Sequence, residues 1–468
     1  MSAVAFEYLR DALLQTIGIA CGSLALALAL GIPLALLIVR PGPLGKAAAA
    51  TATTVRAIPD LVLAIVFVVA VGLGPAAGVI ALGIHYSAVV AKLFAEILSA
   101  VRRDAAEAMR ATGATNAAAF LIGMVPAAWP GLVGFGAYVF ESIVRAAVIV
   151  GVVGAGGIGS LLVQQLNLAD VFGFAQTLLA LVVLVYIADV GSERLRRHAP
   201  PTIVALTYVG LVVVGILAFA LTADPPWRAI SHAPQHLVAF FASAFPLDVS
   251  RKVLAIAAVG VAQCLGVALI GTIAGAILAV PLAWLASSAA RSQTTFHEPN
   301  FYERASALAS RAALGIVRAV PCLALGLIGL SIVGIGLNAG IFALTIHTAG
   351  VLGKLLAESI ETAERQPSEA LAAIGATRSS ATLIGLLPGS LGTMAAHVLY
   401  RFEWNVRAST ILGMVGAGGL GQAIFNAQQL LFYRQLAVYV LVAIVLVLLI
   451  DAGAGWLRVK WHLSGLTT

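Results

Sequence analysis

Charged residues are scarce in this sequence: Asp, Glu, Lys and Arg make up 10% of its 468 positions, whereas hydrophobic residues make up 61%. A soluble globular protein carries about 25% charged residues, so this chain lacks the material for a fully hydrated surface. Long apolar runs account for the shortage, for example residues 24–39, 61–74 and 436–450. Each run belongs to a segment near the ~20 residues that a membrane-crossing helix needs. We therefore predict an all-α polytopic membrane protein, with lipid around most of its surface.

Cysteine is equally scarce. The three cysteines, Cys21, Cys264 and Cys322, lie in apolar stretches without the C-x-x-C spacing of metal or redox sites. They are expected to be small core residues, and no metal site is predicted. The net charge of +7 comes without a dense Lys/Arg run, so nucleic acid is not an expected partner. The excess falls in the connections between apolar segments, where the positive-inside tendency of membrane proteins places it.

The sequence contains two copies of one unit. Residues 107–126 match residues 369–388, and Glu107 and Glu369 lie 262 positions apart. Upstream of residue 287 the offset falls to 248, because the second copy carries 14 extra residues between 287 and 311. Chance does not keep many polar positions in register, so the sequence predicts an internal duplication. The offset of 262 relates His85 to His347, Lys92 to Lys354, Glu96 to Glu358, Glu141 to Glu403, Arg145 to Arg407 and Asp189 to Asp451.

Each copy is predicted to contain five membrane helices, the fourth being long enough to break or re-enter. They are expected near 12–39, 47–72, 77–99, 117–150 and 171–193, and near 253–286, 308–334, 339–361, 379–412 and 434–457. Five crossings reverse the side of the membrane, and an extra apolar run at 202–222 restores it. The prediction is therefore eleven helices, with two parallel repeats joined by a linker helix. The expected boundaries are 1–198, 199–250 and 251–468.

The loop between the third and fourth helices has the same pattern in both copies. A short surface helix is predicted there, ending at a glycine that suits the left-handed position after a helix C-terminus. Thr115 and Thr377 follow as predicted N-caps of the next helix. Alanines on one face of the short helix have small side chains, so another protein could approach this face closely. The glutamate provides a negative charge for such a contact. The repeated residues are Glu107, Ala108 and Gly113, and then Glu369, Ala370 and Gly375.

These loops resemble the EAA-type coupling loop in the permease subunits of binding-protein-dependent ABC importers. In that family the loop docks on a cytoplasmic ATPase that binds ATP and Mg²⁺, and an external binding protein delivers the cargo. The resemblance implies a type I importer permease in the cytoplasmic or inner membrane, with both loops on the cytoplasmic side. It further implies two ATPase subunits and a binding protein as partners, and no cofactor bound by this chain. Such permeases usually form dimers, so one fused chain is expected to replace the pair.

A second resemblance narrows the cargo. The stretch "YRFEWNVRASTILGMVGAGGLGQAI" is similar to the C-terminal signature of phosphonate-transporter permeases, and "YVFESIVRAAVIVGVVGAGGIGSLL" is a looser version. The first copy has Ser142 and Ile143 where the second has Trp404 and Asn405, so equal contact of both halves with cargo stays open. Phosphonate or a related phosphorus oxyanion is the expected cargo.

Other functions remain as alternatives. Phosphate, phosphite, methionine or an organosulfur anion are possible cargos of the same class, and an ion-driven secondary transporter with parallel repeats is a different class. A membrane-embedded enzyme is not indicated, because no catalytic constellation is apparent. The chain is not expected to be an ATPase either, since "GPLGKA" and "GVLGKL" lack the spacing and final hydroxyl of the Walker pattern.

Both copies also contain Gly-x-Gly-x-x-Gly. A dinucleotide site needs a strand before these glycines and a βαβ unit around them, whereas membrane helices are expected here. Nucleotide binding is therefore not predicted. The glycines are expected to permit close helix contact or to break a helix. They are Gly154, Gly156 and Gly159 in the first copy, and Gly416, Gly418 and Gly421 in the second.

Charged residues inside apolar segments are costly, so each needs a reason. Glu141 and Arg145 lie four positions apart, as do Glu403 and Arg407, and such pairs can neutralise each other on one helix face. Alternatively, the two arginines present guanidinium groups to an anionic cargo, whose oxygens they match in a bidentate way. Asn405, Glu141 and Glu403 are further candidates for the cargo pathway.

Two more pairs of residues recur in the apolar segments. His85 and His347 are expected to form local hydrogen bonds, with a place in the cargo pathway as the alternative. Asp189 and Asp451 close the fifth helices, and we expect them to pair with the basic residues at those helix ends.

Overall fold

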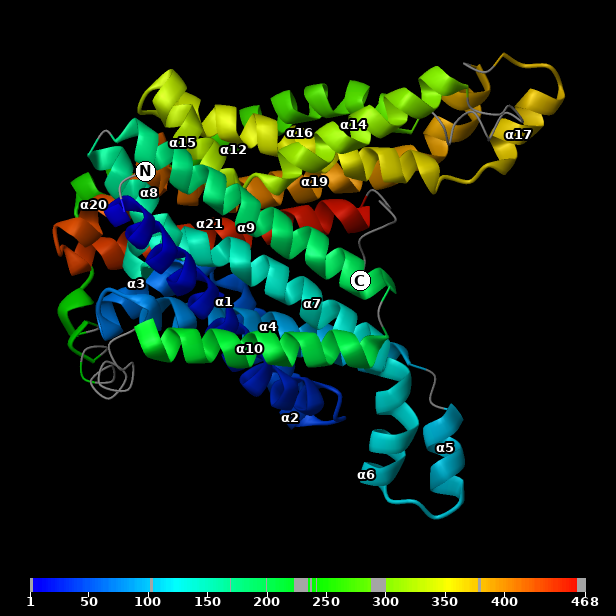
Figure 1. Ribbon diagram of the computed structural model, residues 1–468, viewed down its shortest axis with the longest axis horizontal. Coiled ribbons are helices and arrows are strands. Elements are labelled where there is room, and N and C mark those ends of the chain that lie inside the picture. Colours follow the sequence, from blue (N-terminus) through cyan, green and yellow to red (C-terminus); the bar gives the residue numbers. More distant parts are fainter. Residues whose placement is uncertain are drawn as a thin grey trace. The chain divides into compact units, whose positions relative to one another are not determined.

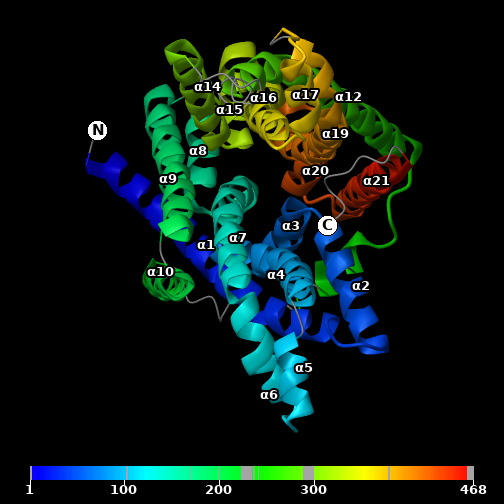
Figure 2. The same ribbon diagram turned by 90° about the vertical axis from the view of Figure 1, so that its right-hand side faces the viewer.

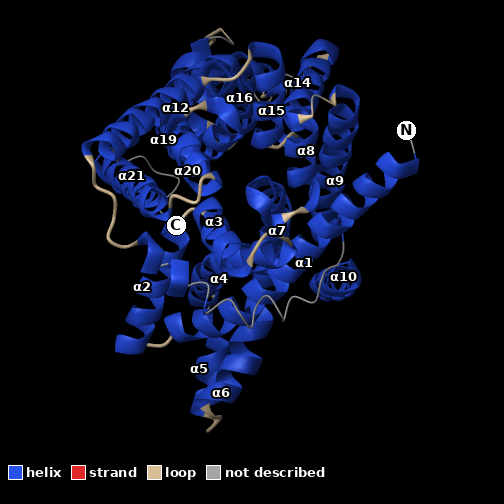
Figure 3. Cartoon of the chain, turned by 90° about the vertical axis from the view of Figure 1, so that its left-hand side faces the viewer, coloured by secondary structure: helices blue, strands red, loops and turns tan. Residues whose placement is uncertain are grey.

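The computed structural model describes residues 3–101, 104–168, 170–198, 200–222, 235, 238–240, 242–287, 300–377 and 380–460. Within these ranges the chain is built of helices and short loops, without a strand (Figure 3). The prediction of an all-helical protein is confirmed. The chain divides into two compact units, Met1–Ser243 and Ala244–Thr468.

In the first unit, α1, α4 and α7 pack against one another, and α9 lies against α7 (Figure 1). The short helices α5 and α6 extend beyond the ends of α4 and α7 (Figure 2). The elements are α1 (Ala3–Ile38), α2 (Pro43–Ala57), α3 (Asp60–Val71), α4 (Pro75–Ala100), α5 (Asp104–Ala111), α6 (Asn116–Ala118), η1 (Ala119–Met124), α7 (Val125–Val150), η2 (Gly151–Ala155), α8 (Gly157–Asn167), α9 (Val171–His198) and α10 (Pro201–Thr222).

The second unit repeats this order. Its first helix packs along α16 and α19, as α1 packs along α4 and α7, and α17 packs against the segment that leads into α19. The predicted duplication is therefore visible in the order and packing of the helices. The elements are α12 (Arg251–Ala286), α14 (Phe301–Ala319), α15 (Cys322–Val333), α16 (Leu337–Glu361), α17 (Gln366–Ala373), η3 (Ala381–Leu386), α19 (Leu387–Leu412), η4 (Gly413–Ala417), α20 (Gly419–Gln429) and α21 (Tyr433–Lys460).

The predicted linker helix, α10, is part of the first unit. It packs along α1, where Gly215 leaves room for the Cys21 side chain. The Tyr208 hydroxyl donates a hydrogen bond to Ser192 Oγ at 2.7 Å, and its ring lies 5.5 Å from that of Phe140. The linker helix is thus held on the first repeat.

Eight helices of the described residues are long and apolar enough to cross a membrane, or ten if each of two bent pairs is one span. The helix α10 is a shorter apolar helix beside them. The predicted total of eleven is compatible with these numbers and stays a prediction.

The second predicted span of each copy is not a single helix, so that part of the prediction is wrong. The axes of α2 and α3 differ by 86°, and those of α14 and α15 by 85°. Each break lies directly before a proline, where Ile58 and Val320 adopt extended backbone. Proline disfavours helical backbone in the residue that precedes it, which explains the position of the break. His85 Nδ1 lies 3.1 Å from the Ile58 carbonyl oxygen, one of the acceptors at the break.

Candidate functional site

The short helices α5 and α17 end in the same backbone motif. Gly113 and Gly375 have φ values of +91° and +86°, the left-handed conformation that glycine adopts without strain. In the first unit Ala114 N donates to Met109 O, and Gly113 N to Arg110 O, both at 3.0 Å. This pair of bonds is the Schellman motif, and it confirms the predicted helix end. The second unit repeats it, from Ala376 N to Leu371 O and from Gly375 N to Ala372 O.

Each short helix is folded back onto the start of the next long helix through a glycine that the sequence reasoning missed. A Cβ at Gly123 would lie 2.9 Å from Ala106 Cα, and one at Gly385 would lie 2.6 Å from Ser368 Cα. Ala106 and Ser368 are accordingly buried, at 1% and 0% exposure. The signal was present, because Gly123 and Gly385 occupy matching positions in the two copies. We call these two paired segments, residues 104–124 and 366–386, the loop hairpins.

The face of each loop hairpin that points away from the glycine contact is exposed and carries small side chains. Glu107, Ala108 and Ala370 are exposed, and Glu369 is partly so. The following helices begin at the predicted caps: Thr115 Oγ1 accepts from Ala118 N at 3.2 Å, and Thr377 Oγ1 accepts from Ser380 N at 3.3 Å. Small side chains beside a carboxylate form a surface that another protein can approach closely.

The glycine-rich stretches break the fourth long helix of each unit. Gly154, Gly156 and Gly157 have φ values of +109°, +84° and +75°, and α8 begins there in a new direction. The third glycine of the motif serves close packing instead. A Cβ at Gly159 or at Gly421 would overlap a backbone carbonyl oxygen of the preceding helix. Both expected roles of the glycines, breakage and close contact, are therefore present. The break recurs at Gly416, Gly418 and Gly419, with φ of +110°, +78° and +76°.

Side chains of the first helix occupy the amides that a phosphate would need. A phosphate on a helix N-terminus binds its first free N–H groups. In α8 the amide of Gly157 donates to Gln15 Oε1, and that of Ile158 donates to Thr16 Oγ1, both at 2.9 Å. In α20 the corresponding acceptors are Gln263 Oε1 at 2.9 Å and Cys264 Sγ at 3.4 Å. The glycine motif is a structural joint in both units.

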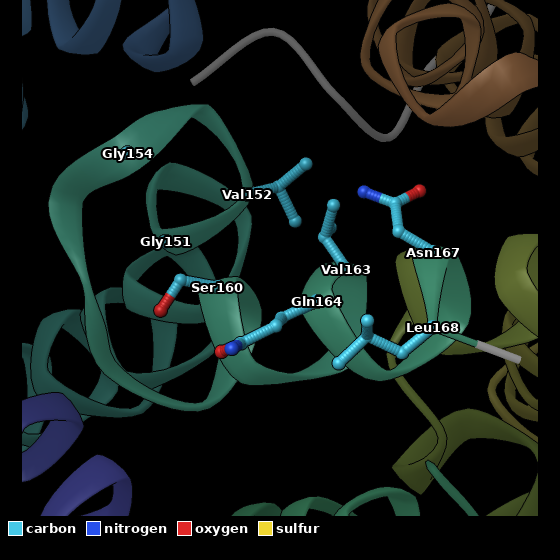
Figure 4. A pocket seen from close by; sticks show the side chains of 8 residues that line it. All are labelled: Gly151, Val152, Gly154, Ser160, Val163, Gln164, Asn167 and Leu168. Atoms are coloured by element: carbon cyan, nitrogen blue, oxygen red, sulfur yellow. The ribbon is translucent and has the colours of Figure 1, made fainter. Parts of the chain in front are cut away.

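An open pocket of about 350 Å³ lies beside this joint in the first unit (Figure 4). None of the side chains that line it is ionisable, so the pocket offers an anion no cation. Its lining residues are Gly151, Val152, Gly154, Ser160, Val163, Gln164, Asn167 and Leu168.

The two predicted pathway arginines form ion pairs with the fifth helix. Arg145 Nη1 lies 2.5 Å from Asp189 Oδ1, and Arg407 Nη2 lies 2.7 Å and 2.9 Å from the carboxylate oxygens of Asp451. Both arginines thus have a salt-bridge partner on the fifth helix, whereas the sequence pointed to the glutamate four positions earlier on their own helix. The two aspartates, expected to pair with basic helix ends, each pair with an arginine of the fourth long helix. A cargo role for either arginine stays a prediction.

The glutamate of the second copy, Glu403, pairs with Arg458 of α21 instead. The side chains of Glu403 and Arg458 are 7% and 18% exposed, and Arg458 Nη1 donates to Glu403 Oε1. Arg458→Met is expected to lower the free energy of unfolding by about 3 kcal/mol, because it leaves a buried carboxylate without its cation. Thermal unfolding of the purified chain in detergent measures this effect.

The matched control removes both charges. Glu403→Gln together with Arg458→Met is expected to recover most of the lost stability, since no buried charge is then left alone. Equal unfolding temperatures for Arg458→Met and the unaltered chain would show that the pair contributes nothing.

A buried polar cluster occupies the core of the second unit, between α12, α16 and α19. Asn405 is fully buried, and its Nδ2 donates to Thr272 Oγ1 at 2.7 Å and to Thr348 Oγ1 at 3.0 Å. Arg401, one turn earlier, is 3% exposed. Its Nη2 lies 3.0 Å from His347 Nδ1 and 3.4 Å from Asn405 Oδ1. Two predicted pathway residues, His347 and Asn405, are thus brought together.

Trp404 covers this cluster. Its ring stacks on that of His347, with centroids 4.8 Å apart and planes 13° from parallel. The guanidinium carbon of Arg401 lies 4.2 Å from the Trp404 ring centroid, a cation–π distance. Arg401 was not among the residues predicted from the sequence; its counterpart in the first copy is Val139, so it lacks the matching position that Arg145 and Arg407 share. Residues that are polar in only one copy would have been the signal.

The family described as "Binding-protein-dependent transport system inner membrane component" matches residues 27–200 and 300–460. The chain belongs to this family. It is the multi-pass membrane component, or permease, of a binding-protein-dependent transport system. The two matched segments fall one in each unit.

Curated relatives support the assignment of the permease. The Phosphate-import permease protein PhnE of Mycolicibacterium smegmatis is 30% identical over 89% of this chain and 78% of its own length. The Phosphite transport system permease protein PtxC of Stutzerimonas stutzeri is 37% identical over 40% of this chain and 66% of its own. A chain of the inward-facing MetNI methionine ABC transporter is 26% identical, with a TM-score of 0.38, and covers 42% of this permease and 98% of that chain.

Proposed function

We propose that this chain is the permease of an ATP-driven importer for a phosphorus oxyanion: phosphonate, phosphate or phosphite. The names of two relatives, which specify phosphate and phosphite, support this class of cargo. The C-terminal signature shared with phosphonate permeases supports it as well. The observation that carries the import mechanism is the pair of loop hairpins, which have the same Schellman end and the same glycine contact in both units.

One chain would supply both halves of the path. Each loop hairpin would dock on one cytoplasmic ATPase, which binds ATP and Mg²⁺, and an external binding protein would deliver the cargo. Closure of the ATPases around ATP would push both hairpins and switch the path from inward-facing to outward-facing. The chain itself needs no bound cofactor for this role, because the energy enters through its partners.

Reconstitution with the ATPase and the binding protein in liposomes tests this proposal. Phosphonate, phosphate or phosphite is expected to stimulate ATP hydrolysis several-fold and to be taken up, and vanadate is expected to stop the uptake. Methionine and an alkylsulfonate serve as controls, because they represent the alternative cargos of the same transporter class. Stimulation by these two alone would reject the cargo class, and uptake driven by an ion gradient without ATP would reject the mechanism.

A further inference from the structure

Arg401 is more deeply buried than the ion-pairing arginines of the apolar helices, and its partners differ from theirs. Arg145, Arg407 and Arg458 each form an ion pair with a carboxylate of a neighbouring helix. Within the described ranges, 3–287 and 300–460 with their gaps, Arg401 forms no ion pair with a carboxylate. A guanidinium at 3% exposure is therefore without a counter-ion there.

The groups around Arg401 are neutral acceptors, an imidazole and an amide, and they occupy only part of its hydrogen-bonding capacity. Its Nη2 faces His347 Nδ1 and Asn405 Oδ1. Its Nε is buried, and no residue of the described chain accepts a hydrogen bond from it. A buried cation with an unused donor costs free energy unless an anion compensates it.

We propose that Arg401, together with His347 and Asn405, forms an oxyanion-binding site in the second unit, which the cargo occupies during transport. The proposal rests on the proposed function for the identity of the cargo. A tetrahedral phosphorus oxyanion places two oxygens at the spacing of a guanidinium edge. Nε can bind one of them, and Nη2 can bind the other once it exchanges one of its present acceptors, His347 Nδ1 or Asn405 Oδ1, for the anion. The Asn405 amide, fixed by two threonine hydroxyls, holds the polar wall in position.

The site is present once in the chain. The first-copy counterparts of Arg401 and Asn405 are Val139 and Ile143, which have no polar group to offer an anion. The counterpart of Thr348 is Tyr86. One anion per chain is therefore expected, although the loop hairpins are present twice. Trp404 and His347 stack beside the guanidinium in this structure, so the anion enters only when the Trp404 ring moves.

Direct binding to the full chain in lipid nanodiscs tests the site, with radiolabelled inorganic phosphate as the probe and methylphosphonate as competitor. We expect saturable binding of one phosphate per chain. Arg401→Gln should weaken it at least tenfold. Arg401→Lys should keep part of the affinity, because a point charge remains without the planar fork.

The matched control is Arg311→Gln, which removes an arginine of the same unit that pairs with Glu361 near the helix ends. It is expected to leave phosphate affinity unchanged. Monodispersity and the unfolding temperature report whether each variant folds. If Arg401→Gln does not fold, Arg401→Lys decides. Affinity equal to that of the unaltered chain in the folded variants overturns the site, as does the absence of saturable binding at millimolar phosphate.

The liposome experiment separates this inference from the proposed function. Uptake of a phosphorus oxyanion without any effect of Arg401 on binding would reject the site and leave the function intact. Binding that depends on Arg401 in an importer that takes up only sulfonate would retain an oxyanion site and reject the phosphorus cargo.

Discussion

Replacing Gly123 and Gly385 with leucine is expected to abolish cargo-stimulated ATP hydrolysis in the assembled transporter. Each glycine lets the short helix of a loop hairpin rest on the next helix, with Ala106 Cα or Ser368 Cα less than 3 Å from a Cβ at that position. A leucine there must push the short helix away by several ångströms, because protein interiors leave no room for such a side chain. The docking surface would then no longer match the ATPase.

The chain itself should survive this change, because the loop hairpins lie beyond the ends of the long helices (Figure 1). Membrane insertion and yield are therefore expected to stay near those of the unaltered protein. Gly136→Val is the matched control, since Gly136 has open space around it and Val398 stands at the same place in the second copy. Full stimulation in the double leucine variant would contradict the role of the hairpins.

Gly421→Ala is expected to reduce the folded yield severely, and Gly159→Ala together with it should abolish folding. A methyl group at Gly421 would overlap the carbonyl oxygen of Thr410, and one at Gly159 that of Val148. Overpacking of this kind costs about 1–3 kcal/mol when neighbours can move, and more when the obstacle is backbone. Fluorescence-detected size exclusion and thermal unfolding measure the loss.

Gly266→Ala provides the comparison within a long helix. Nothing lies within 4 Å of a Cβ at Gly266, so the substitution is expected to be neutral or to stabilise the helix by up to about 1 kcal/mol. An unaltered yield for Gly421→Ala would mean that the two helices can separate at the joint, contrary to the packing described above.

Features that depend on local chemistry could be predicted from the sequence. Gly113 and Gly375 end their helices because a left-handed residue is needed there, and Thr115 caps the next helix through its own hydroxyl. The break of the fourth helix was indicated by the length of that segment and by the glycine motif that follows it. The duplication made each of these predictions stronger, because the same residues had to serve the same purpose twice.

Features that depend on partners distant in the sequence could not be predicted. The pairing of Arg145 with Asp189 spans 44 positions, whereas the sequence drew attention to Glu141, only four positions away. The right-angled bends before Pro59 and Pro321 were missed, although each coincides with a change from a weakly apolar helix, α2 or α14, to a strongly apolar one, α3 or α15. Arg401 was missed for another reason. Its counterpart in the first copy is not polar, and its unusual feature, burial without a carboxylate partner among the described residues, can be seen only in the folded chain.

Arg401 and Val139 occupy the same position in the two copies but differ in charge, and this difference has a consequence for how such a transporter can evolve. In an assembly of two identical subunits, every substitution is made on both sides at once, and a cation that helps on one side is duplicated on the other. Joining the two halves in one chain removes this coupling. Each half can then specialise, so that one half keeps the residues that bind the solute while the other has apolar residues at the same positions.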